Sequence, residues 1–484
     1  MNVAAAPVSP AALRAYVASL PPDAAGLRGA VLLLSGRHEV MGGLLITNSG
    51  VVLRGEGSKT ALVAAGLDRR TLIRVVGRAD LKAGPRIAVA EEVLAGACGL
   101  RVQAASALKS GELVRITRPS TKEWIAKLGA NEFGGGEGGG WKPGSRDITW
   151  ECTITAIEGD RITLDAPITT ALEPGAFLSP ITSIGPISQV GIENLSLEST
   201  FDASNARDEN HSWCAITMEN AADAWVRQIT FKYFAGSAVA LYETCRRITV
   251  QDCVSLAPIS EIGGYRRHTF FTMGQQTLFL RCYAEYGRHD FSVGHCAAGP
   301  NAFVQCEARE ALADSGPIES WAGGVLYDNV NIDGNALTLG YRAGNNAGIG
   351  WAAANSVLWN CSASVIRCWN PPGATNWSFG SWASFEGDGV WKSSNDFMTP
   401  DSLFAAQLDA RLRTNSGNAN VPASRLLQLM PRPREESSNP PLDKAQELAA
   451  ASHQPAPQLL DYIATASRRD PIPGEAGDVM RVEE

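Results

Sequence analysis

Titratable side chains crowd into one dozen residues of the 484-residue chain, the stretch EYGRHDFSVGHC at positions 285–296. It holds Arg288, His289, Asp290 and His295, in a chain that has only six histidines. Between 265 and 295, four arginines and two acids (Arg266, Arg267, Arg281 and Arg288 against Glu285 and Asp290) give a balance of +2, in a chain of net charge −8. A site built here would attract an anion.

This mixture of arginine, histidine and acid suits β-elimination of a uronic-acid polymer. The reaction needs a cation on the sugar carboxylate and a base of near-neutral pKa for the C5 proton. Arg288 or Arg267 could bind the carboxylate with two hydrogen bonds. His289 could be the base, with its ring oriented by Asp290 or Asp314. The predicted catalytic residues are His289, Arg288, Asp290, His268, Arg267, Asp314 and Glu319.

Glycoside hydrolysis is the main enzymatic alternative, because it needs two carboxyl groups about 5 Å apart for retention or about 6.5–9.5 Å apart for inversion. Asp290, Asp314, Glu261 and Glu319 would supply them. Two other hypotheses stay open: a lyase, isomerase or cyclase for a small glycoside or another metabolite, and a noncatalytic carbohydrate-binding protein. Loss of His289 would hurt a lyase most, whereas loss of a carboxylate would hurt a hydrolase most.

Aromatic and charged residues near these positions are expected to bind a carbohydrate, which the charge argument makes anionic. The predicted substrate-binding residues are Tyr265, Arg266, Glu261, His295, Trp321, Arg342 and Trp351. Tyr265 or Tyr286 could also donate a proton to the leaving oxygen. No cofactor is expected, and no metal site, since the chain has no CxxC pair and no clear cluster of calcium ligands.

The elements that must position these residues form a repeat. Strand-like segments recur as GIENLSLES, VRQITFKYF, VQDCVSLAP, FLRCYAEYG, FVQCEAREA, LYDNVNIDG and LWNCSASVI. Alignment on the residue after a polar pair gives Leu195, Ile229, Cys253, Cys282, Cys306, Val330 and Cys361, at intervals of 34, 24, 29, 24, 24 and 31. Intervals in the twenties with strand periodicity predict a parallel β-helix, whose coils stack at about 4.8 Å.

Stacking predicts which residues meet. Cys253, Cys282, Cys306 and Cys361 should form an interior column of small apolar side chains rather than a metal site or disulfides. Seven or eight residues beyond three of the aligned positions come Ser260 and Glu261, then His289 and Asp290, then Ala313 and Asp314. These pairs are predicted to form a second column, at one corner of three successive coils.

The architecture predicted for the whole chain is an all-β fold with additions at both ends. Residues 1–30 are a capping segment with a helix at 10–20, residues 31–100 the first coils, and residues 181–395 the main β-helix with the candidate site. Hairpin patterns at 101–180 indicate an inserted small β subdomain. Residues 396–484 are expected to hold a capped helix and a loosely ordered tail.

The capping segment, the phrase GVVLRGEG and the ladder of Asn, Asp and Cys strands resemble the pectate-lyase-like family of single-stranded right-handed parallel β-helix proteins, over roughly residues 10–395. The resemblance implies a right-handed coil and, for most of the family, polysaccharide substrates. It is unspecific for the reaction, because the fold carries lyases, hydrolases, epimerases and noncatalytic fibres.

A bacterial subgroup of that family is also similar in GRHDF, AGPNAFVQC, SGPIESWAGGVLYDNV and GIGWAAANSVLWNC. The subgroup carries His-His-Arg where this chain has Ile318, Glu319 and Ser320, and a histidine where it has Ile349. If those histidines serve the subgroup's chemistry, this chain has altered or lost it.

The net charge of −8 argues against a nucleic-acid or membrane partner. No apolar run is long enough to span a bilayer, and the N-terminus lacks the basic start and apolar core of a secretory signal. The chain as given is therefore expected to be cytoplasmic, or secreted or periplasmic if a signal was removed. Oligomerisation is compatible with the sequence.

Overall fold

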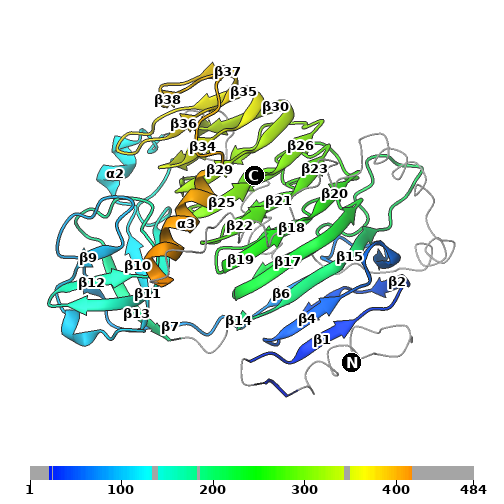
Figure 1. Cartoon of the computed structure of the whole chain (residues 1–484), viewed down its shortest axis with the longest axis horizontal. Coiled ribbons are helices and arrows are strands. Elements are labelled where there is room, and N and C mark those ends of the chain that lie inside the picture. The colour runs from blue at the N-terminus through cyan, green and yellow to red at the C-terminus, as the bar shows by residue number, and fades with distance from the viewer. Residues whose placement is uncertain (1–20, 24–25, 133–139, 183–185, 343–348, 417–484) are drawn as a thin grey trace.

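The computed structural model describes residues 21–23, 26–132, 140–182, 186–342 and 349–416. Its strands wind into a parallel β-helix, and a smaller antiparallel subdomain lies beside the coils (Figure 1). The predicted fold class is therefore confirmed. The capping helix predicted at 10–20, most of the FGGGEGGGW loop and the tail beyond 416 lie outside the described residues.

The coils of the β-helix place their strands on three faces. Face 1 contains β1 (Gly29–Leu32), β4 (Val51–Arg54), β19 (Arg246–Gln251), β22 (Leu278–Leu280), β25 (Asn301–Val304), β29 (Val325–Asp328), β34 (Val357–Trp359), β36 (Trp377–Phe379) and β38 (Val390–Lys392). Face 2 contains β2 (Gly36–Met41), β5 (Thr60–Ala65), β20 (Val254–Leu256), β23 (Tyr283–Glu285), β26 (Glu307–Arg309), β30 (Asn331–Leu339), β35 (Ser362–Cys368) and β37 (Trp382–Glu386).

Face 3 is a separate seven-stranded parallel sheet that supports the candidate site. It contains β3 (Leu44–Ile46), β6 (Ile73–Val76), β16 (Ile216–Glu219), β18 (Val239–Leu241), β21 (Phe270–Thr272), β24 (Phe291–Val293) and β27 (Gly316–Pro317). Two long strands, β15 (Gly191–Ser199) and β17 (Ala221–Lys232), bend from face 1 into face 2, and β14 (Ile187–Ser188) pairs with β17. Short additions are η1 (Gly57–Lys59), the parallel pair β28 (Ala322–Gly323) and β33 (Ala353–Ala354), and the antiparallel pair β31 (Tyr341–Arg342) and β32 (Gly350–Trp351).

The bend between faces 1 and 2 is made by one residue in the left-handed region, directly before each aligned repeat position. These residues are Asn194, Gln228, Asp252, Arg281, Gln305, Asn329 and Asn360, with φ from 50° to 60°. Asn and Asp tolerate this conformation better than most residues do, which explains why four of the seven are Asn or Asp. The polar pair in each repeat is therefore a corner signal.

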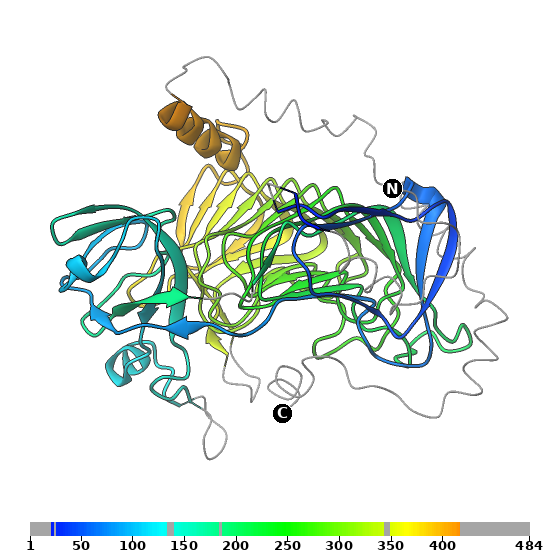
Figure 2. The ribbon, with the colours of Figure 1, turned by 90° about the horizontal axis from the view of Figure 1, so that it is seen from below.

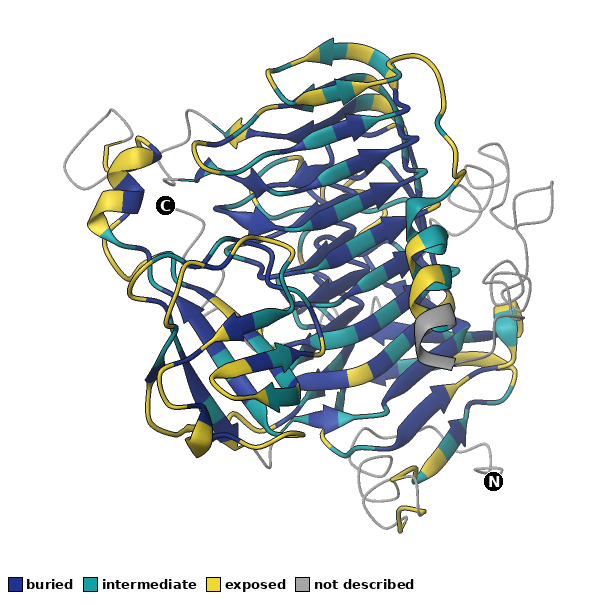
Figure 3. Cartoon of the chain, turned by 60° about the vertical axis from the view of Figure 1, so that its left-hand side comes forward, coloured by how far each residue is buried: buried dark blue, intermediate teal, exposed yellow. Residues whose placement is uncertain are grey.

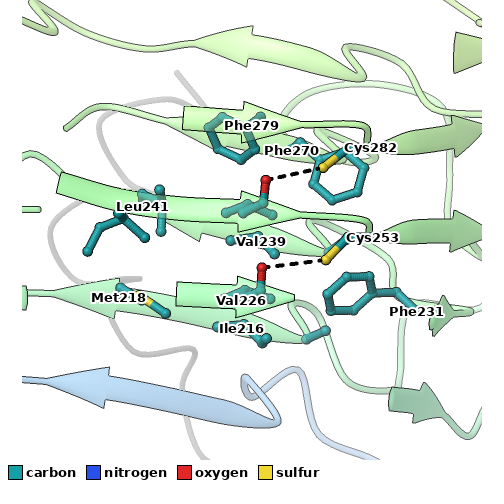
Figure 4. Close-up of a cluster of buried hydrophobic side chains, with 14 of the residues drawn as sticks. Ile216, Met218, Val226, Phe231, Val239, Leu241, Cys253, Phe270, Phe279 and Cys282 are labelled. Atoms are coloured by element: carbon teal, nitrogen blue, oxygen red, sulfur yellow. Dashed lines mark hydrogen bonds between the residues drawn. The ribbon is translucent and has the colours of Figure 1, made fainter. Parts of the chain in front are cut away.

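The predicted alignment of the repeats is confirmed by the strand register. Leu195 pairs with Ile229, and the residues that follow the later aligned positions pair in the order Thr230, Val254, Tyr283, Glu307, Asn331 and Ser362. The four aligned cysteines are buried free thiols. Each lies within hydrogen-bonding distance of a carbonyl of the preceding coil, as for Cys253 with Val226 and Cys282 with Val250, at 3.8 and 3.6 Å (Figure 4).

Aromatic side chains form the centre of the core beneath the candidate site. The Phe279, Phe303 and Tyr327 rings stack coil upon coil, with centroids 4.8 and 5.0 Å apart, and Phe270 stacks on Phe291 at 5.8 Å. All five are fully buried. Large apolar residues on the inner side of every coil therefore hold the stack together, and Figure 3 shows this buried interior.

Phe303→Ala is expected to lower the free energy of unfolding by about 3–5 kcal/mol, because it opens a cavity between two stacked rings. Phe397→Ala is the matched control, since that ring is 59% exposed and its loss should cost under about 0.5 kcal/mol. Urea unfolding followed by tryptophan fluorescence measures both. Equal losses for the two variants would contradict the stacked core.

The inserted subdomain is an antiparallel sheet in the order β7-β13-β10-β11-β12-β9, with β8 also pairing with β13. Its elements are β7 (Lys82–Ala83), β8 (Ile87–Ala88), β9 (Gly99–Arg101), η2 (Ala105–Ala107), β10 (Leu113–Arg118), α2 (Lys122–Lys127), β11 (Ile148–Glu158), β12 (Arg161–Leu164) and β13 (Phe177–Thr182). The sheet thus begins at Lys82, before the boundary expected at 101. Its first strands have only two or three residues, too short to show an alternating pattern.

The inserted subdomain packs tightly on the β-helix beside face 3 (Figure 2). Trp150 Nε1 donates to the Ala298 carbonyl at 2.9 Å, and Asn355 Nδ2 donates to the Thr169 carbonyl at 2.9 Å. Trp321 and Ala298 of the β-helix belong to the same apolar core as the subdomain residues. The subdomain and the β-helix therefore share one apolar core beside face 3.

After the last coil the chain turns back along face 1 into α3 (Leu403–Ser416). Ser402 Oγ accepts from the Ala405 amide at 3.1 Å and so caps the helix. The Asp328 carboxylate accepts from Ser402 Oγ and from the Phe404 amide, both at 2.7 Å, which fixes the start of α3 to β29. None of the helices in the described ranges is long and apolar enough to cross a membrane.

Candidate functional site

The candidate site lies on the outer side of face 3, over β21, β24 and β27. Three loops lead from face 2 into these strands, and His268, His289 and Asp314 are the second-to-last residues of these loops. Phe270 pairs with Phe291, and Ser292 pairs with Gly316, so the three loop ends lie on successive coils. Sequence elements of three coils thereby meet at one corner.

One part of the predicted column is wrong. The register places His289 and Asp290 against Ala313 and Asp314 as predicted, but it places His268 and Thr269, not Ser260 and Glu261, on the coil before. The loop before β21 spans 257–269, against 286–290 before β24, so counting from Cys253 ends inside the longer loop. Glu261 is instead exposed and pairs with Arg207 at 3.3 Å.

His289 is a neutral, oriented imidazole. Its Nδ1 lies 2.6 Å from the Asp314 carbonyl oxygen and 3.6 Å from Asp314 Oδ1. A carbonyl only accepts, so Nδ1 carries the hydrogen and Nε2 keeps its lone pair. Burial and the nearby Arg342 charge lower the pKa of His289 to about 4. Nε2 makes no hydrogen bond to any described residue.

Asp314 is held by Arg342 through two hydrogen bonds of 3.2 and 2.7 Å. Burial alone would raise the pKa of Asp314, but the Arg342 charge and its hydrogen bonds outweigh burial and keep the pKa below its ordinary value. Arg342 Nε also donates to the Pro317 carbonyl at 2.8 Å. Arg342, predicted to bind substrate, therefore fixes the residue that orients His289.

His268 lies edge-on to His289, with ring centroids 4.9 Å apart. Its Nε2 bonds the Gly264 carbonyl at 3.2 Å, and its Nδ1 is buried with no partner among the described residues. Burial, with a smaller contribution from the Arg288 charge, puts the pKa of His268 well below its ordinary value. His268 is therefore a neutral neighbour of the base with no exposed lone pair of its own.

Tyr265 and Glu319 continue the row on the other side of His268. The Tyr265 ring lies 5.0 Å from the His268 ring, and its hydroxyl donates to Glu319 Oε1. Glu319 Oε2 accepts from the His295 amide at 2.5 Å. Burial raises the pKa of Glu319 despite these hydrogen bonds. We call Glu319, Tyr265, His268, His289 and Asp314 the site row.

The predicted arginines have different fates. Arg288 is half-buried, donates to the Gly264 carbonyl, and forms no ion pair with any described acid. Arg267 is buried, and it donates to the Ser260 hydroxyl and carbonyl and to the Tyr286 carbonyl, at 2.9 to 3.2 Å. Its role is to fix the 257–269 loop, so Arg288 is the better candidate for binding an anion.

Arg266 points away from the site row. It bonds Glu209 at 2.6 and 3.2 Å, and Arg69 bonds the same carboxylate at 2.7 Å. Both guanidinium groups lie over the Trp213 ring, at 5.5 and 4.8 Å from its centroid. This cluster anchors the loop that carries Tyr265 and His268.

Asp290 does not orient His289, because His289 Nδ1 bonds the Asp314 carbonyl and no described hydrogen bond joins it to Asp290. Asp290 is fully buried under the loops, where Oδ1 accepts from Thr269 Oγ1 at 2.7 Å. Burial raises the pKa of Asp290 to about 7. Glu285, which the sequence did not single out, is a second buried acid, and burial raises its pKa to about 7 as well.

The two predicted tryptophans differ in access to the surface. Trp321 is 1% exposed, donates to Thr170 Oγ1 at 3.2 Å and packs on Trp124, so it joins the subdomain to the β-helix and presents no stacking surface. Trp351 is half-buried and packs edge-on against Tyr341 at 5.3 Å in the β31 and β32 hairpin. Only Trp351 could contact a sugar.

Arg146 of the inserted subdomain is a functional candidate that the sequence did not reveal. Its guanidinium lies over the Trp141 ring of the subdomain, and its charge opposes the burial that raises the pKa of Glu319. No motif marks it, because it lies in another part of the fold. Within the described ranges, no group of three or more His, Cys, Asp and Glu side chains could hold a metal ion.

Comparisons with known proteins give a family match over the end of the chain and distant likenesses over its coils. A family described as "Domain of unknown function (DUF6298)" matches residues 389–484. No curated protein matches the chain. Among solved structures, the chain is similar to the tailspike gp61 of Pseudomonas phage phi297, with a TM-score of 0.45 and 12% identity over 79% of this chain and 65% of the tailspike, less than two thirds of its length.

A mannuronan C-5 epimerase module and an alginate lyase are also among the similar structures. The A-module of the mannuronan C-5 epimerase AlgE4 from Azotobacter vinelandii has a TM-score of 0.34 and 11% identity, over 80% of this chain and 92% of the module. The alginate lyase from Paenibacillus sp. str. FPU-7 has a TM-score of 0.34 and 6% identity, over 80% of this chain and 96% of the lyase.

Proposed function

We propose that the chain is a carbohydrate-active enzyme that cleaves a uronic-acid-containing polysaccharide by β-elimination at the site row. One observation carries the proposal: a neutral imidazole, held at Nδ1 and open at Nε2, lies beside a half-buried guanidinium that no described acid neutralises. The imidazole belongs to His289 and the guanidinium to Arg288. Base and anion-binding group are the two parts that elimination needs.

In the proposed reaction, residues of the site row and the arginines beside it have separate roles. Arg288 binds the uronate carboxylate and stabilises the charge that develops when the C5–H bond breaks. His289 Nε2 takes that proton, the electron pair forms the C4–C5 double bond, and the C4–O bond breaks. The Tyr265 hydroxyl protonates the leaving oxygen, and solvent returns the proton from His289 to Tyr265. Arg342 and Asp314 act only by holding the His289 ring.

A panel of uronate polymers tests the proposal. Elimination creates a conjugated unsaturated uronide, so ultraviolet absorbance should rise with time for at least one polymer incubated with the pure protein. New reducing ends should appear at the same rate. Reducing ends without absorbance would reject elimination, and neither signal on any polymer would reject depolymerisation altogether.

The acid limb of kcat/KM for elimination is expected near pH 4 rather than near the ordinary histidine value of about 6.5. The base must be unprotonated, so the rate rises with pH through the pKa of His289, which burial and Arg342 lower. In Arg342→Gln the limb should move upward, because one lowering charge is gone and Asp314 keeps its own. Initial rates from pH 3.5 to 8 measure this. An unmoved limb would contradict the assignment of His289.

Hydrolysis is the second candidate, because two carboxyl groups of the site row have pKa values shifted in opposite directions. Burial raises the pKa of Glu319, whereas Arg342 keeps that of Asp314 low. Opposite shifts suit an acid and a base or nucleophile. Both carboxylate oxygens of Asp314 accept a hydrogen bond from Arg342, which makes Asp314 a poorer nucleophile than a carboxylate without such bonds. Reducing ends that depend on Glu319 but not on His289 would favour this candidate.

A further inference from the structure

The inserted subdomain brings a second guanidinium to the Glu319 end of the site row. Arg146 belongs to a tight turn between α2 and β11, and its amide donates to Ser120 Oγ at 3.0 Å. The Asp147 carboxylate accepts from the amide and hydroxyl of Ser120, at 2.7 and 2.9 Å. The backbone at Arg146 is therefore fixed rather than a free loop.

Aromatic packing fixes the direction in which Arg146 reaches. Its guanidinium lies over the Trp141 ring, 5.5 Å from the centroid. Trp141 packs on Trp124 at 5.6 Å, and Trp124 packs on Trp321 at 4.8 Å. Trp321 follows Glu319 by two residues, so this chain of rings joins the Arg146 turn to the segment that carries Glu319. The Arg146 charge accordingly opposes the burial that raises the pKa of Glu319.

Arg146 lacks a partner for its charge. It forms no ion pair with any described acid, and its one described side-chain hydrogen bond is from NH1 to the Ser145 carbonyl at 2.8 Å. Its Nε is buried with no hydrogen-bond partner among the described residues. Burial also lowers the pKa of Arg146. A partly desolvated guanidinium without an anion is costly, and a bound carboxylate would satisfy it.

We infer that Arg146 is a second anion-binding group, so that the enzyme takes an oligomer with at least two acidic sugars. This inference rests on the proposed function, in which Arg288 holds the carboxylate of the sugar that reacts. Arg288 donates to the Gly264 carbonyl that His268 also contacts, whereas Arg146 belongs to the inserted subdomain, so the two guanidinium groups come from different parts of the fold. Arg146 therefore receives the carboxylate of another sugar in the same strand, and the subdomain selects chain length.

Calorimetry in the His289→Ala background tests the inference. It measures the binding of galacturonate and mannuronate as monomers and as hexamers. Arg146→Gln is expected to weaken hexamer binding by about 10-fold or more and to leave monomer binding within about 2-fold, since the monomer reaches only Arg288. Arg146→Lys should fall between, because it keeps the charge but not the two-pronged contact. Lys142→Gln, an exposed charge in the same turn region, is the matched control.

Each outcome separates the two proposals. Unchanged hexamer affinity in Arg146→Gln, with native circular dichroism, would overturn the inference even if the wild-type protein cleaves the polymer. Hexamer binding that depends on Arg146, without any cleavage by the wild-type protein, would support the inference and remove the elimination chemistry. Absence of binding to every acidic oligomer would overturn both.

Discussion

Replacing His289 by alanine is expected to lower kcat/KM for polymer cleavage by about 10²–10⁴-fold, the usual contribution of a positioned general base. The loss should fall on kcat, because the imidazole takes the C5 proton only as the transition state forms. Initial rates of ultraviolet absorbance on the preferred polymer measure it. His289 is buried, so the circular dichroism of the variant is compared with that of the wild-type protein to show that the variant is folded.

Two matched histidine variants make this result specific. His38→Ala, in β2, removes an imidazole that bonds the Leu34 carbonyl at 2.8 Å on the first coils, and it should leave the rate unchanged. His268→Gln should cost less than His289→Ala, because both nitrogens of His268 are buried or engaged. Elimination that survives in His289→Ala and disappears in His268→Gln would transfer the role of base to His268.

The fold was predictable because the same corner conformation and the same buried position recur along the coils of the β-helix. A left-handed corner residue such as Asp252 or Asn360 must be followed by an inward residue, and the interior there has room only for a side chain of modest size. That constraint produces the same short sequence pattern at Cys253 and at Cys361, so aligning the patterns gives the strand register of the structure. The strength of the signal comes from its recurrence, not from any single strand.

The candidate site was only partly predictable, because its loops do not repeat. His289 and Asp314 follow corners by similar counts, so arithmetic places them together. The loop before β21 is longer, and no local feature tells where its extra residues bulge out, so the count reached Glu261 instead of His268. Position along a loop fixes a side chain only when the loop length equals that of its neighbours.

Burial separates residues that look alike in sequence. Arg267 and Arg288 both lie beside a histidine in a polar loop, yet Arg267 is buried in carbonyl contacts and Arg288 is not. Asp290 follows His289 directly and still points beneath the loop, where Gly287 leaves it space, since a Cβ there would collide with Asp290 Oδ1. Arg146 gave no signal because only tertiary packing brings it to the row. Such choices depend on neighbours distant in sequence.

Two histidines of the site row are uncharged, and arginines lie around the row. Burial keeps His268 and His289 uncharged, and Arg342 forms an ion pair with Asp314. Arg288 and Arg146 form no ion pair with a described acid, so their charges are the ones left for a ligand. A local positive field in a chain of charge −8 is the physical basis on which we propose an acidic glycan as substrate.

Arg288→Ala is expected to lower kcat/KM for elimination by about 10²–10³-fold, because the charge that develops on the uronate carboxylate would lose its nearest cation. KM should rise as well as kcat fall, since Arg288 contacts the carboxylate before and during proton removal. Arg288→Lys should recover part of the rate through its charge alone. The acid limb should also move upward in Arg288→Ala, because the Arg288 charge helps to lower the pKa of His289.

Arg247→Ala is the control for a generic loss of positive charge, since Arg247 pairs with Asp223 at 2.6 and 2.8 Å on face 1, away from the site row. It should leave both KM and the acid limb in place. If Arg288→Ala cleaves the acidic polymer as fast as the wild-type protein does, then Arg288 is not the carboxylate-binding group. In that case the elimination chemistry lacks its electrophilic half, and Glu319-dependent hydrolysis becomes the better reading of the same row.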